Sequence, residues 1–405
     1  MLNRRRLLPI AACVIMALAS APTAVHARDY RFDGKMARPV LENYLSRSIT
    51  MMDLLTGRGN VDDNVRMLQE TGAKFAGRTI YLWGHENELP TRLATGRQIA
   101  PRIHAVDPEM ILQAGIFEIV SEEVERIPVP AWAFEAFGQS AEQRTFRYEA
   151  MIYPNGRGHN HWRPGSSIPD ISRPETKLWF YYLAASYIDL GCEAIHFGQA
   201  EIMDGNDPDH RHWWELLEHV RQYAAQHARR HFVVCDAHVP SGGMLHGERL
   251  LFDVHSFPLR IVEVPDRPQE GILKMEAFDG IYGRSLGGIS PSGWRCEHLP
   301  YLVELDNWGV SNRPGKPHAG GCWIWGYDEM SWFAHQDQAY RNQWLRYAWD
   351  WVREHDPNGF LQMPGSRILH SPVDGQYWYH ANARSEAVPH GFGQEDAVRA
   401  IWSTN

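Results

Sequence analysis

The chain has 405 residues, of which 44% are hydrophobic and 22% charged, and its formal net charge at pH 7 is −9. This composition is typical of a folded globular protein and excludes a disordered or fibrous chain. The acidic balance argues against nucleic acid and against anionic membrane surfaces as partners.

The first 27 residues resemble an export signal. Residues 4–6 are three arginines, residues 7–21 form an apolar stretch, and residues 25–27 form a small-x-small cleavage site before Arg28. We expect residues 1–27 to be a signal peptide of the Sec or, because of the run "RRRLL", the twin-arginine type, which predicts a periplasmic or secreted protein. No later segment reaches about 18 continuous apolar residues, so no membrane span is expected.

The pattern after residue 27 predicts one barrel with two extensions. Residues 28–73 are expected to be an N-terminal helical extension ending in "NVDDNVRMLQETG". Residues 74–355 are expected to form the barrel, and residues 356–405 a C-terminal cap with one late helix, "QEDAVRAIW".

Within 74–355, strand-like runs that end in polar residues recur, and helical patterns separate most of them. Pro174 and Gly191 delimit one helical pattern, and two others cover 212–230 and 339–355. Strands that alternate with helices predict parallel pairing and right-handed crossovers. The eight strand-like runs are "GRTIYLWGHEN" (77–87), "MILQAGIFEIV" (110–120), "FRYEAMIYP" (146–154), "CEAIHFGQAE" (192–201), "HFVVCDAH" (231–238), "LLFDVHSF" (250–257), "YLVELDNWG" (301–309) and "GCWIWGYDE" (321–329).

Eight such units predict an α/β fold of the (β/α)8 TIM-barrel class. An open doubly wound sheet is the structural alternative, but the first strand-to-helix turn lacks the G-x-G-x-x-G phosphate signature. In a barrel, functional side chains collect at the carboxyl ends of the strands. Acids, imidazoles and tryptophans gather at these ends: His85, Glu86, Glu118, His159, His161, Trp162, Gln199, Glu201, Asp236, His238, Asp253, His255, Glu304, Asp306, Asn307, Trp323, Trp325, Asp328 and Glu329.

Two of these acids follow runs that lie nearly opposite each other in an eight-strand barrel. Glu201 ends the fourth run and Glu304 lies in the seventh. Two carboxyl groups about 5 Å apart suit a retaining glycosidase, whereas a gap of roughly 6.5–9.5 Å leaves room for water and predicts inversion. Glu118 is the reserve candidate for the general acid. In an alternative that stays open, Glu304 pairs with Arg295 or another arginine and Asp306 is the working acid.

These residues resemble the clan of (β/α)8-barrel retaining glycoside hydrolases with the acid/base after strand four and the nucleophile after strand seven. The run "YLVELDNWG" is similar to the nucleophile strand of xylanase-type members. The resemblance implies Glu304 as nucleophile, Glu201 as acid/base, and Trp323 or Trp325 as an aromatic floor. Ala200 stands where the clan usually has Asn before the acid/base.

The sequence therefore predicts an exported glycoside hydrolase that acts on an oligo- or polysaccharide without a cofactor. Three alternatives stay open: a polysaccharide lyase, a carbohydrate-binding barrel without activity, and a metal-dependent hydrolase. The expected sugar-binding side chains are His85, Glu118, His159, His161, Trp162, Gln199, His238, His255, Asn307, Trp323 and Trp325.

No metal site is predicted. The first run offers no His-x-His pair, and the "GHNHW" motif at 158–162 lies in a Gly-rich loop. Beyond residue 27 the four cysteines match no zinc spacing. Cys192 and Cys235 are expected to be buried thiols, while Cys296 and Cys322 are open to either a disulfide or free thiols.

Overall fold

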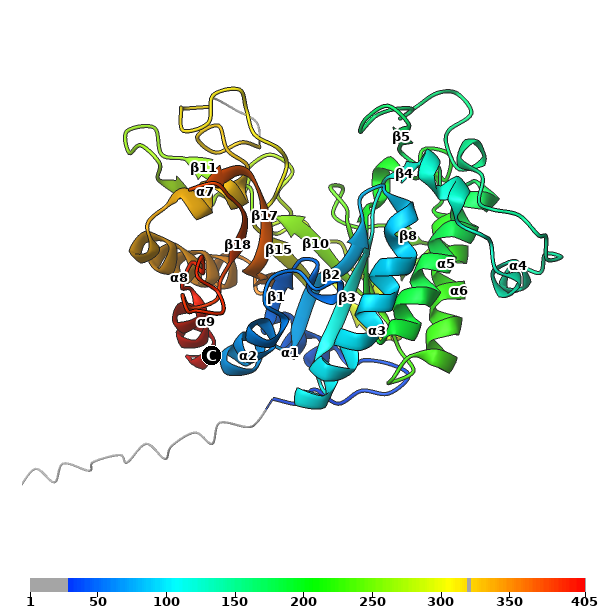
Figure 1. The fold of residues 1–405 in the computed structure, drawn as a ribbon, viewed down its shortest axis with the longest axis horizontal. Coiled ribbons are helices and arrows are strands. Elements are labelled where there is room, and N and C mark those ends of the chain that lie inside the picture. The colour runs from blue at the N-terminus through cyan, green and yellow to red at the C-terminus, as the bar shows by residue number, and fades with distance from the viewer. Residues whose placement is uncertain (1–27, 319–321, 405) are drawn as a thin grey trace, which may run out of the picture.

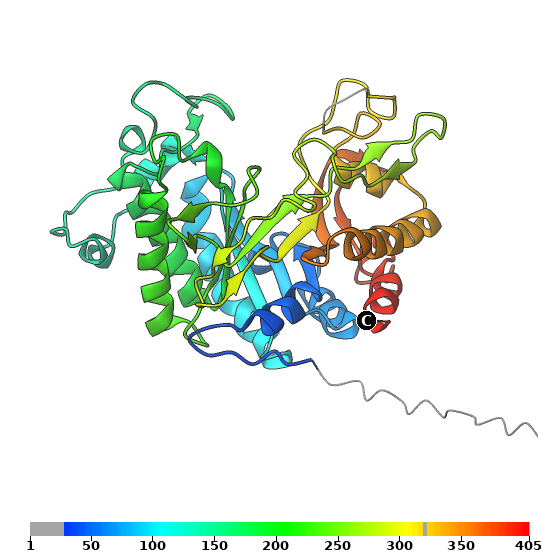
Figure 2. The same cartoon turned by 180° about the vertical axis from the view of Figure 1, so that it is seen from behind.

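The computed structural model describes residues 28–318 and 322–404 of the chain. The expected signal peptide, residues 1–27, lies outside the described residues. The described part is a mixed α/β structure in which helices flank a curled sheet without enclosing it, as Figures 1 and 2 show from two sides.

The main sheet has ten strands and is almost entirely parallel. Every neighbouring pair is parallel except β17–β18. Most central strands are buried on both faces, as expected of a parallel sheet covered by helices. In spatial order the strands are β16 (Gly359–Leu361), β15 (Tyr301–Glu304), β10 (Val254–Pro258), β7 (Val234–His238), β6 (Ala194–Gln199), β3 (Ile111–Ile116), β2 (Phe75–Leu82), β1 (Ser48–Met51), β17 (Met363–Val373) and β18 (Gln376–His380).

Helices lie outside this sheet and short elements occupy the loops. The helices are α1 (Arg38–Leu45), α2 (Val61–Thr71), α3 (Leu89–Val106), α4 (Ala131–Ala136), α5 (Pro174–Leu190), α6 (Arg211–His227), α7 (Glu329–His335), α8 (Gln338–His355) and α9 (Glu395–Ser403). Single 3₁₀ turns are η1 (Leu54–Thr56), η2 (Glu86–Glu88), η3 (Glu122–Arg126), η4 (Tyr148–Ala150) and η5 (Ala200–Ile202). Two-residue strands are β4 (Val120–Ser121), β5 (Ser166–Ser167), β8 (Leu245–His246), β9 (Arg249–Leu250), β11 (Val262–Glu263), β12 (Gly271–Ile272), β13 (Gly288–Ile289) and β14 (Arg295–Cys296).

The helices predicted from apolar spacing are confirmed. The patterns at 173–191, 212–230 and 339–355 correspond to α5, α6 and α8. α5 begins with Pro174 in its first turn and ends at Gly191, which adopts the left-handed conformation with φ of 104°. That conformation lets the Gly191 N–H satisfy a carbonyl of the last turn, as a glycine C-cap does.

Two of the eight predicted strands are wrong. Residues 146–154 form the turn η4 and a buried loop, because Met151, Ile152 and Tyr153 fill the core without pairing in the main sheet. In the described part of the run 321–329, the only pairing is a tight turn between Ile324 and Tyr327. The apolar residues of both runs cover the core from loops, which a strand pattern cannot distinguish from a buried strand.

Two other parallel strands take their places. β1 lies within 28–73, which was expected to be helical, and Gly359–Val373 lies within the expected cap at 356–405. The expected domain boundaries at 74 and 355 therefore cut through the sheet. The gain of β1 makes up for the loss of the predicted strand at 146–154. In chain order, β6 is therefore still the fourth parallel strand and β15 the seventh.

The segment Gly359–Val373 is hydrogen-bonded on both sides. Its first part, β16, pairs with β15, and its second part, β17, pairs with β1. Only Gln362 lies between them, and its N–H donates to the Val303 carbonyl at 2.8 Å. The regular alternation predicted for (β/α)8 is incomplete, because β7 and β10 are followed by loops with short strands instead of helices.

An apolar plug closes the amino end of the sheet. α1 and the segment before it pack Tyr30, Met36 and Tyr44 against the first residues of the strands, among them Phe75 and Ile111. The amino ends are thus buried in an apolar cluster, which leaves the carboxyl ends for polar side chains.

Candidate functional site

We use the name strand-end site for the side chains around Glu304 at the carboxyl ends of the parallel strands. Glu304 is the last residue of β15 and is 5% exposed. Its Oε2 accepts from Arg367 Nη1 at 2.6 Å and from Thr50 Oγ1 at 3.0 Å, and its Oε1 pairs with Arg78. Burial would raise the pKa of Glu304, but Arg78 and Arg367 oppose it and lower the pKa to about 2. The carboxylate is therefore held ionised.

Both arginines are fixed by further contacts. Arg78 lies at an irregularity between β2 and β3 with φ of 57°, and its N–H donates to Gln113 Oε1 at 3.1 Å. Arg367 donates through Nε and Nη2 to Asn307 Oδ1 at 2.9 and 2.6 Å. Asn307 thus uses its side-chain oxygen to hold Arg367, and its expected contact with sugar hydroxyls stays a prediction.

A second buried network lies on neighbouring strands. His196 Nδ1 lies 2.7 Å from Asp236 Oδ2, and Gln113 Nε2 donates to Asp236 Oδ1 at 2.6 Å. Ser256 Oγ lies 3.2 Å from His196 Nδ1. The positive charge that His196 can carry is one of the influences that lower the pKa of Glu304, so this network is close to the strand-end site.

Sequence reasoning missed most of these interior residues. These polar residues lie within strands of the main sheet: Thr50, Arg78, Gln113, His196 and Arg367. A polar residue in a strand buried on both faces must find a partner inside the sheet. That pattern is the signal that could have found them.

A third cluster lies after β10 and β15. Arg260 Nη1 donates to Asp306 Oδ2 at 2.8 Å, and Arg260 Nε donates to Asp279 Oδ1 at 2.6 Å. The Asp306 N–H donates to Glu329 Oε2 at 3.0 Å. Burial raises the pKa of Glu329 to about 7. Asp306, the reserve carboxylate, is thus paired with a cation beside the strand-end site.

Glu201 and Glu304 have no partner in common among the described residues. Glu201 lies in η5, directly after β6, and its Oε1 accepts from Ser241 N at 2.9 Å and from Ser241 Oγ at 2.5 Å. Glu118 is buried at the end of β3 and accepts from Gln199 N at 2.7 Å and Gln199 Nε2 at 2.8 Å. The structure therefore brings Glu118 and Gln199 together, whereas Glu201 is hydrogen-bonded to Ser241 in the loop after β7.

Exposed tryptophans flank the same edge of the sheet. Trp83, after β2, is 38% exposed. Its ring centroid lies 5.2 Å from that of Phe117 and 5.1 Å from that of Trp162, both in edge-on geometry. Trp308, after β15, is 61% exposed and its carbonyl accepts from Trp323 Nε1 at 2.7 Å. Indole faces of this kind can stack on apolar faces of a ligand.

Trp325 does not offer such a face. It is 2% exposed, and its Nε1 donates to the Glu270 carbonyl at 2.8 Å. Its indole fills the core of a loop, so the structure offers no exposed face of Trp325 for the sugar stacking that the sequence predicts.

The expected histidines separate into exposed and buried groups. His159 and His161 are exposed, and the His161 ring lies 4.6 Å from that of Trp162. His85 is also exposed, and its Nε2 lies 3.3 Å from Arg163 Nη2.

His238 and His255 are less accessible than these three histidines. The His238 ring lies at the end of β7, 4.5 Å from that of Phe257, and burial lowers its pKa to about 4. His255 is fully buried, with Nδ1 3.1 Å from Ser285 Oγ, and a Cβ at Gly243 would come within 2.8 Å of its ring. The loop that carries Gly243 therefore covers His255, and its expected role in sugar binding stays a prediction.

Other expectations concern metals, thiols and membranes. No group of three or more His, Cys, Asp or Glu suited to a metal occurs in 28–318 and 322–404. Cys192, Cys235, Cys296 and Cys322 are all free, and the first two are buried. No helix of the described chain is both long and apolar enough to cross a bilayer.

Comparison with known proteins yields no family assignment. No protein-family profile matches the chain. No curated protein matches it in sequence.

Three solved structures resemble it weakly. A maltogenic α-amylase from Thermotoga neapolitana has a TM-score of 0.41 at 8% identity, covering 88% of this chain and 75% of that chain. A debranching enzyme from Nostoc punctiforme has a TM-score of 0.43 at 11% identity, covering 93% and 76%. A sugar phosphate isomerase/epimerase from Parabacteroides distasonis has a TM-score of 0.28 at 9% identity, covering 88% and 97%. Similarities this weak assign neither fold nor activity.

Proposed function

We propose that the protein is a glycoside hydrolase whose active centre is the strand-end site. The observation that carries this proposal is the ionised Glu304 carboxylate, held by Arg78 and Arg367 at the carboxyl end of a parallel strand. Exposed Trp83 and Trp308 follow strands at the same edge and supply stacking surfaces for sugar rings.

The pairing of Gly359–Val373 with both β15 and β1 supports a closed barrel. We infer that eight parallel strands form a (β/α)8-type barrel in which loops replace the helices after β7 and β10. The carboxyl ends of such a barrel converge on one opening, which would bring the fourth and seventh strands to opposite sides of a bound sugar.

A retaining double displacement fits the charge at Glu304. In the first step a Glu304 oxygen attacks C1 of the sugar while Glu201 gives its proton to the leaving oxygen. In the second step Glu201 takes a proton from water, and the water oxygen displaces Glu304 from C1. A nucleophile must stay ionised, and the two guanidinium groups supply that condition. Oε2 of Glu304 already accepts from Arg367 and Thr50, whereas Oε1 is paired with Arg78 alone in the described chain, so a lone pair of Oε1 is left for the reaction.

Activity assays on neutral oligosaccharides test these roles. Glu304→Gln should lower kcat by about 10³-fold or more, and Glu201→Gln by about 10²–10⁴-fold. Glu248→Gln is the matched control, since Glu248 is exposed and pairs only with Arg295 on the surface. The anomer of the first product, followed by NMR, should keep the configuration of the substrate.

Three results would contradict these roles. Full activity of Glu304→Gln would remove Glu304 from the chemistry. Loss of activity in Glu118→Gln but not in Glu201→Gln would transfer the acid/base role to Glu118, which is buried beside Gln199. Products that absorb in the ultraviolet would indicate a lyase instead.

Export through the Sec or twin-arginine route belongs to the same proposal. It rests on residues 1–27 of the sequence alone. Expression of the full chain in a bacterium should give a periplasmic product that begins near Arg28. An intact N-terminus in the cytoplasm would contradict it.

A further inference from the structure

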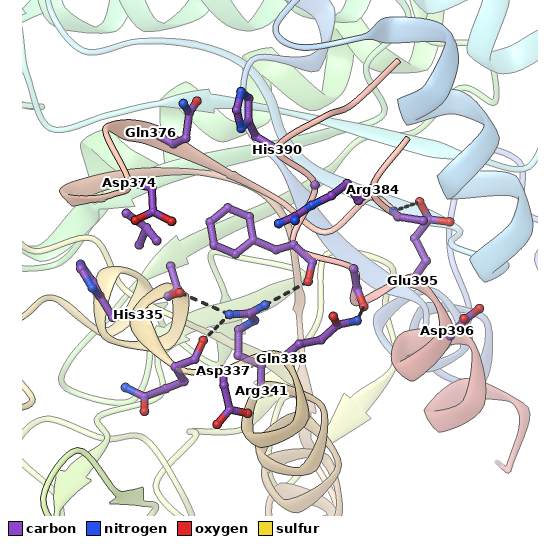
Figure 3. A pocket seen from close by; sticks show the side chains of 17 residues that line it. His335, Asp337, Gln338, Arg341, Asp374, Gln376, Arg384, His390, Glu395 and Asp396 are labelled. Carbon is purple, nitrogen blue, oxygen red and sulfur yellow. Dashed lines mark hydrogen bonds between the residues drawn. The ribbon is translucent and has the colours of Figure 1, made fainter. Parts of the chain in front are cut away.

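A cavity beyond the far end of β17 shares no lining residue with the strand-end site. Its volume is about 680 Å³, within the range of roughly 300–1,000 Å³ typical of small-molecule sites. It is bounded by the end of α7, the start of α8, the turn between β17 and β18, and the loop before α9. Figure 3 shows the side chains of the hairpin and of α8 on opposite sides of this cavity.

Four polar side chains of the cavity have no partner among the described residues. Gln376 is half-buried, while Asp374, Arg384 and His390 are exposed, so the polar groups of these four side chains are open to solvent or to a ligand. None of them makes a side-chain hydrogen bond or ion pair within 28–318 and 322–404. The other acids of the lining are already engaged: Asp337 caps α8, Glu395 pairs with Arg66 and Asp396 pairs with Arg399. The free set therefore contains donors and an acceptor, with one charge of each sign.

The wall that carries these side chains is held in place. Asp374 and Gly375 form a two-residue hairpin turn with φ of 49° and 77°, between the paired residues Val373 and Gln376. Positive φ at both positions is typical of the tight turn that matches the twist of the strands. The turn thus fixes where Asp374 and Gln376 lie.

The floor is equally ordered. Arg341 is buried and donates to the carbonyls of Ala334 at 3.3 Å and Phe392 at 3.0 Å, and Gln338 Nε2 donates to the Gly393 carbonyl at 2.8 Å. These bonds join α7, α8 and the loop before α9. A site formed in advance loses little conformational entropy when a ligand binds.

An aromatic ring completes the lining. Phe392 is half-buried, with its ring 4.8 Å from that of Tyr379 and 5.1 Å from the Arg341 guanidinium. A ligand in the cavity would meet this apolar surface together with donors and acceptors. Hydroxyl groups can donate and accept at once, so they match Asp374 and Arg384 together, whereas a strongly charged ligand would be repelled by one of them.

We propose that this cavity is an accessory site for a neutral oligosaccharide. It would hold a sugar chain away from the strand-end site through Phe392, Asp374, Gln376, Arg384 and His390. The identity of the ligand as a carbohydrate rests on the proposed function, whereas the cavity and its unpartnered side chains do not.

The test uses the full exported chain with Glu304→Gln, so that bound sugar is not cleaved. Maltohexaose, cellohexaose, xylohexaose and mannohexaose are the probes, and hydrogen–deuterium exchange locates binding. At least one hexaose should slow exchange in 373–376 and 384–393. Arg384→Ala should lower the affinity for that hexaose about tenfold, and Gln376→Ala should also lower it.

Arg102→Ala is the matched control, since Arg102 is an exposed arginine of α3 outside the cavity. It should leave the affinity unchanged. Protection that Arg384→Ala and Gln376→Ala both leave intact would overturn the proposal, as would the absence of protection with all four hexaoses.

The two proposals fail separately. If the protein with Glu304 intact cleaves none of the hexaoses but a hexaose slows exchange in the cavity segments, the proposed function is contradicted and the accessory site is supported. If cleavage occurs and depends on Glu304 but 373–376 and 384–393 remain unprotected, the accessory site falls and the proposed function stands.

Discussion

At the scale of single residues, burial controls the charge of Asp328. Its Oδ1 accepts from Ser331 N at 2.8 Å as the N-cap of α7, while its Oδ2 is buried without a partner in the described chain. Burial raises the pKa of Asp328 from 3.8 to about 7. Because the folded chain keeps a proton that the unfolded chain releases, the free energy of unfolding falls as pH rises through this interval and levels off above it.

Asp328→Asn should remove this dependence while keeping the cap. The amide oxygen can still accept from Ser331 N, and the amide nitrogen replaces the unpartnered oxygen. At pH 8 we expect the free energy of unfolding to rise by on the order of 1–3 kcal/mol, and at pH 4 to change little. Urea unfolding at the two pH values measures the difference. An equal effect at both would show that Asp328 does not titrate between them.

Glu304 affects the pH dependence of the free energy of unfolding in the opposite direction to Asp328. Its folded pKa of about 2 lies below the ordinary value of 4.5, so its ion pairs contribute stability that is complete above pH 4.5 and is lost as the pH falls toward 2. The same ion pairs that stabilise the fold at neutral pH thus keep the proposed nucleophile charged.

At the scale of elements, an arginine connects the two ends of the described chain. Arg66 of α2 donates to both oxygens of Glu395 in α9, at 2.9 and 2.7 Å, and to both oxygens of Asp63. Glu395 is buried, and its Oε1 also accepts from Ala383 N at 2.6 Å. The pair therefore holds α9 and the wall of the accessory cavity against α2.

Arg66→Ala should loosen this contact. Because the Arg66 side chain is 35% exposed, solvent screening reduces its contribution, and we expect a loss of about 1–2 kcal/mol in the free energy of unfolding. Amide exchange in α9 should accelerate more than in α5. Arg102→Ala, which breaks an exposed ion pair with Asp62, should change neither quantity measurably. Uniform acceleration in both helices would contradict a local role.

At the scale of the whole molecule, Gly359–Val373 joins the two ends of the parallel series. A chain that ends at Asp356 lacks this segment and exposes the edges of β15 and β1. We expect it to be insoluble or to unfold without cooperativity, because unpaired buried strands leave backbone groups without partners. A chain without residues 1–27 should unfold cooperatively in thermal circular dichroism. Cooperative unfolding of the truncated chain near the temperature of the full chain would show that 357–405 is only a cap.

The sequence predicted what local patterns encode. Apolar spacing with Pro174 and Gly191 at the ends was enough to locate α5, and six of the eight strand-like runs correspond to strands of the main sheet. The polar residues at the strand ends predicted Glu304 at the carboxyl end of a strand, and Glu304 is the last residue of β15. The roles of Glu201 and Glu304 remain predictions.

Only the tertiary structure decided how distant segments complete the sheet and neutralise the site. β1 has four residues, all buried, and so shows no alternation that separates it from a helix or loop. Arg78, Glu304 and Arg367 come from three strands far apart in the chain, and they meet only when the register of those strands is set. Local patterns record which residues prefer to be buried, whereas the partner of a buried charge depends on packing across the whole molecule.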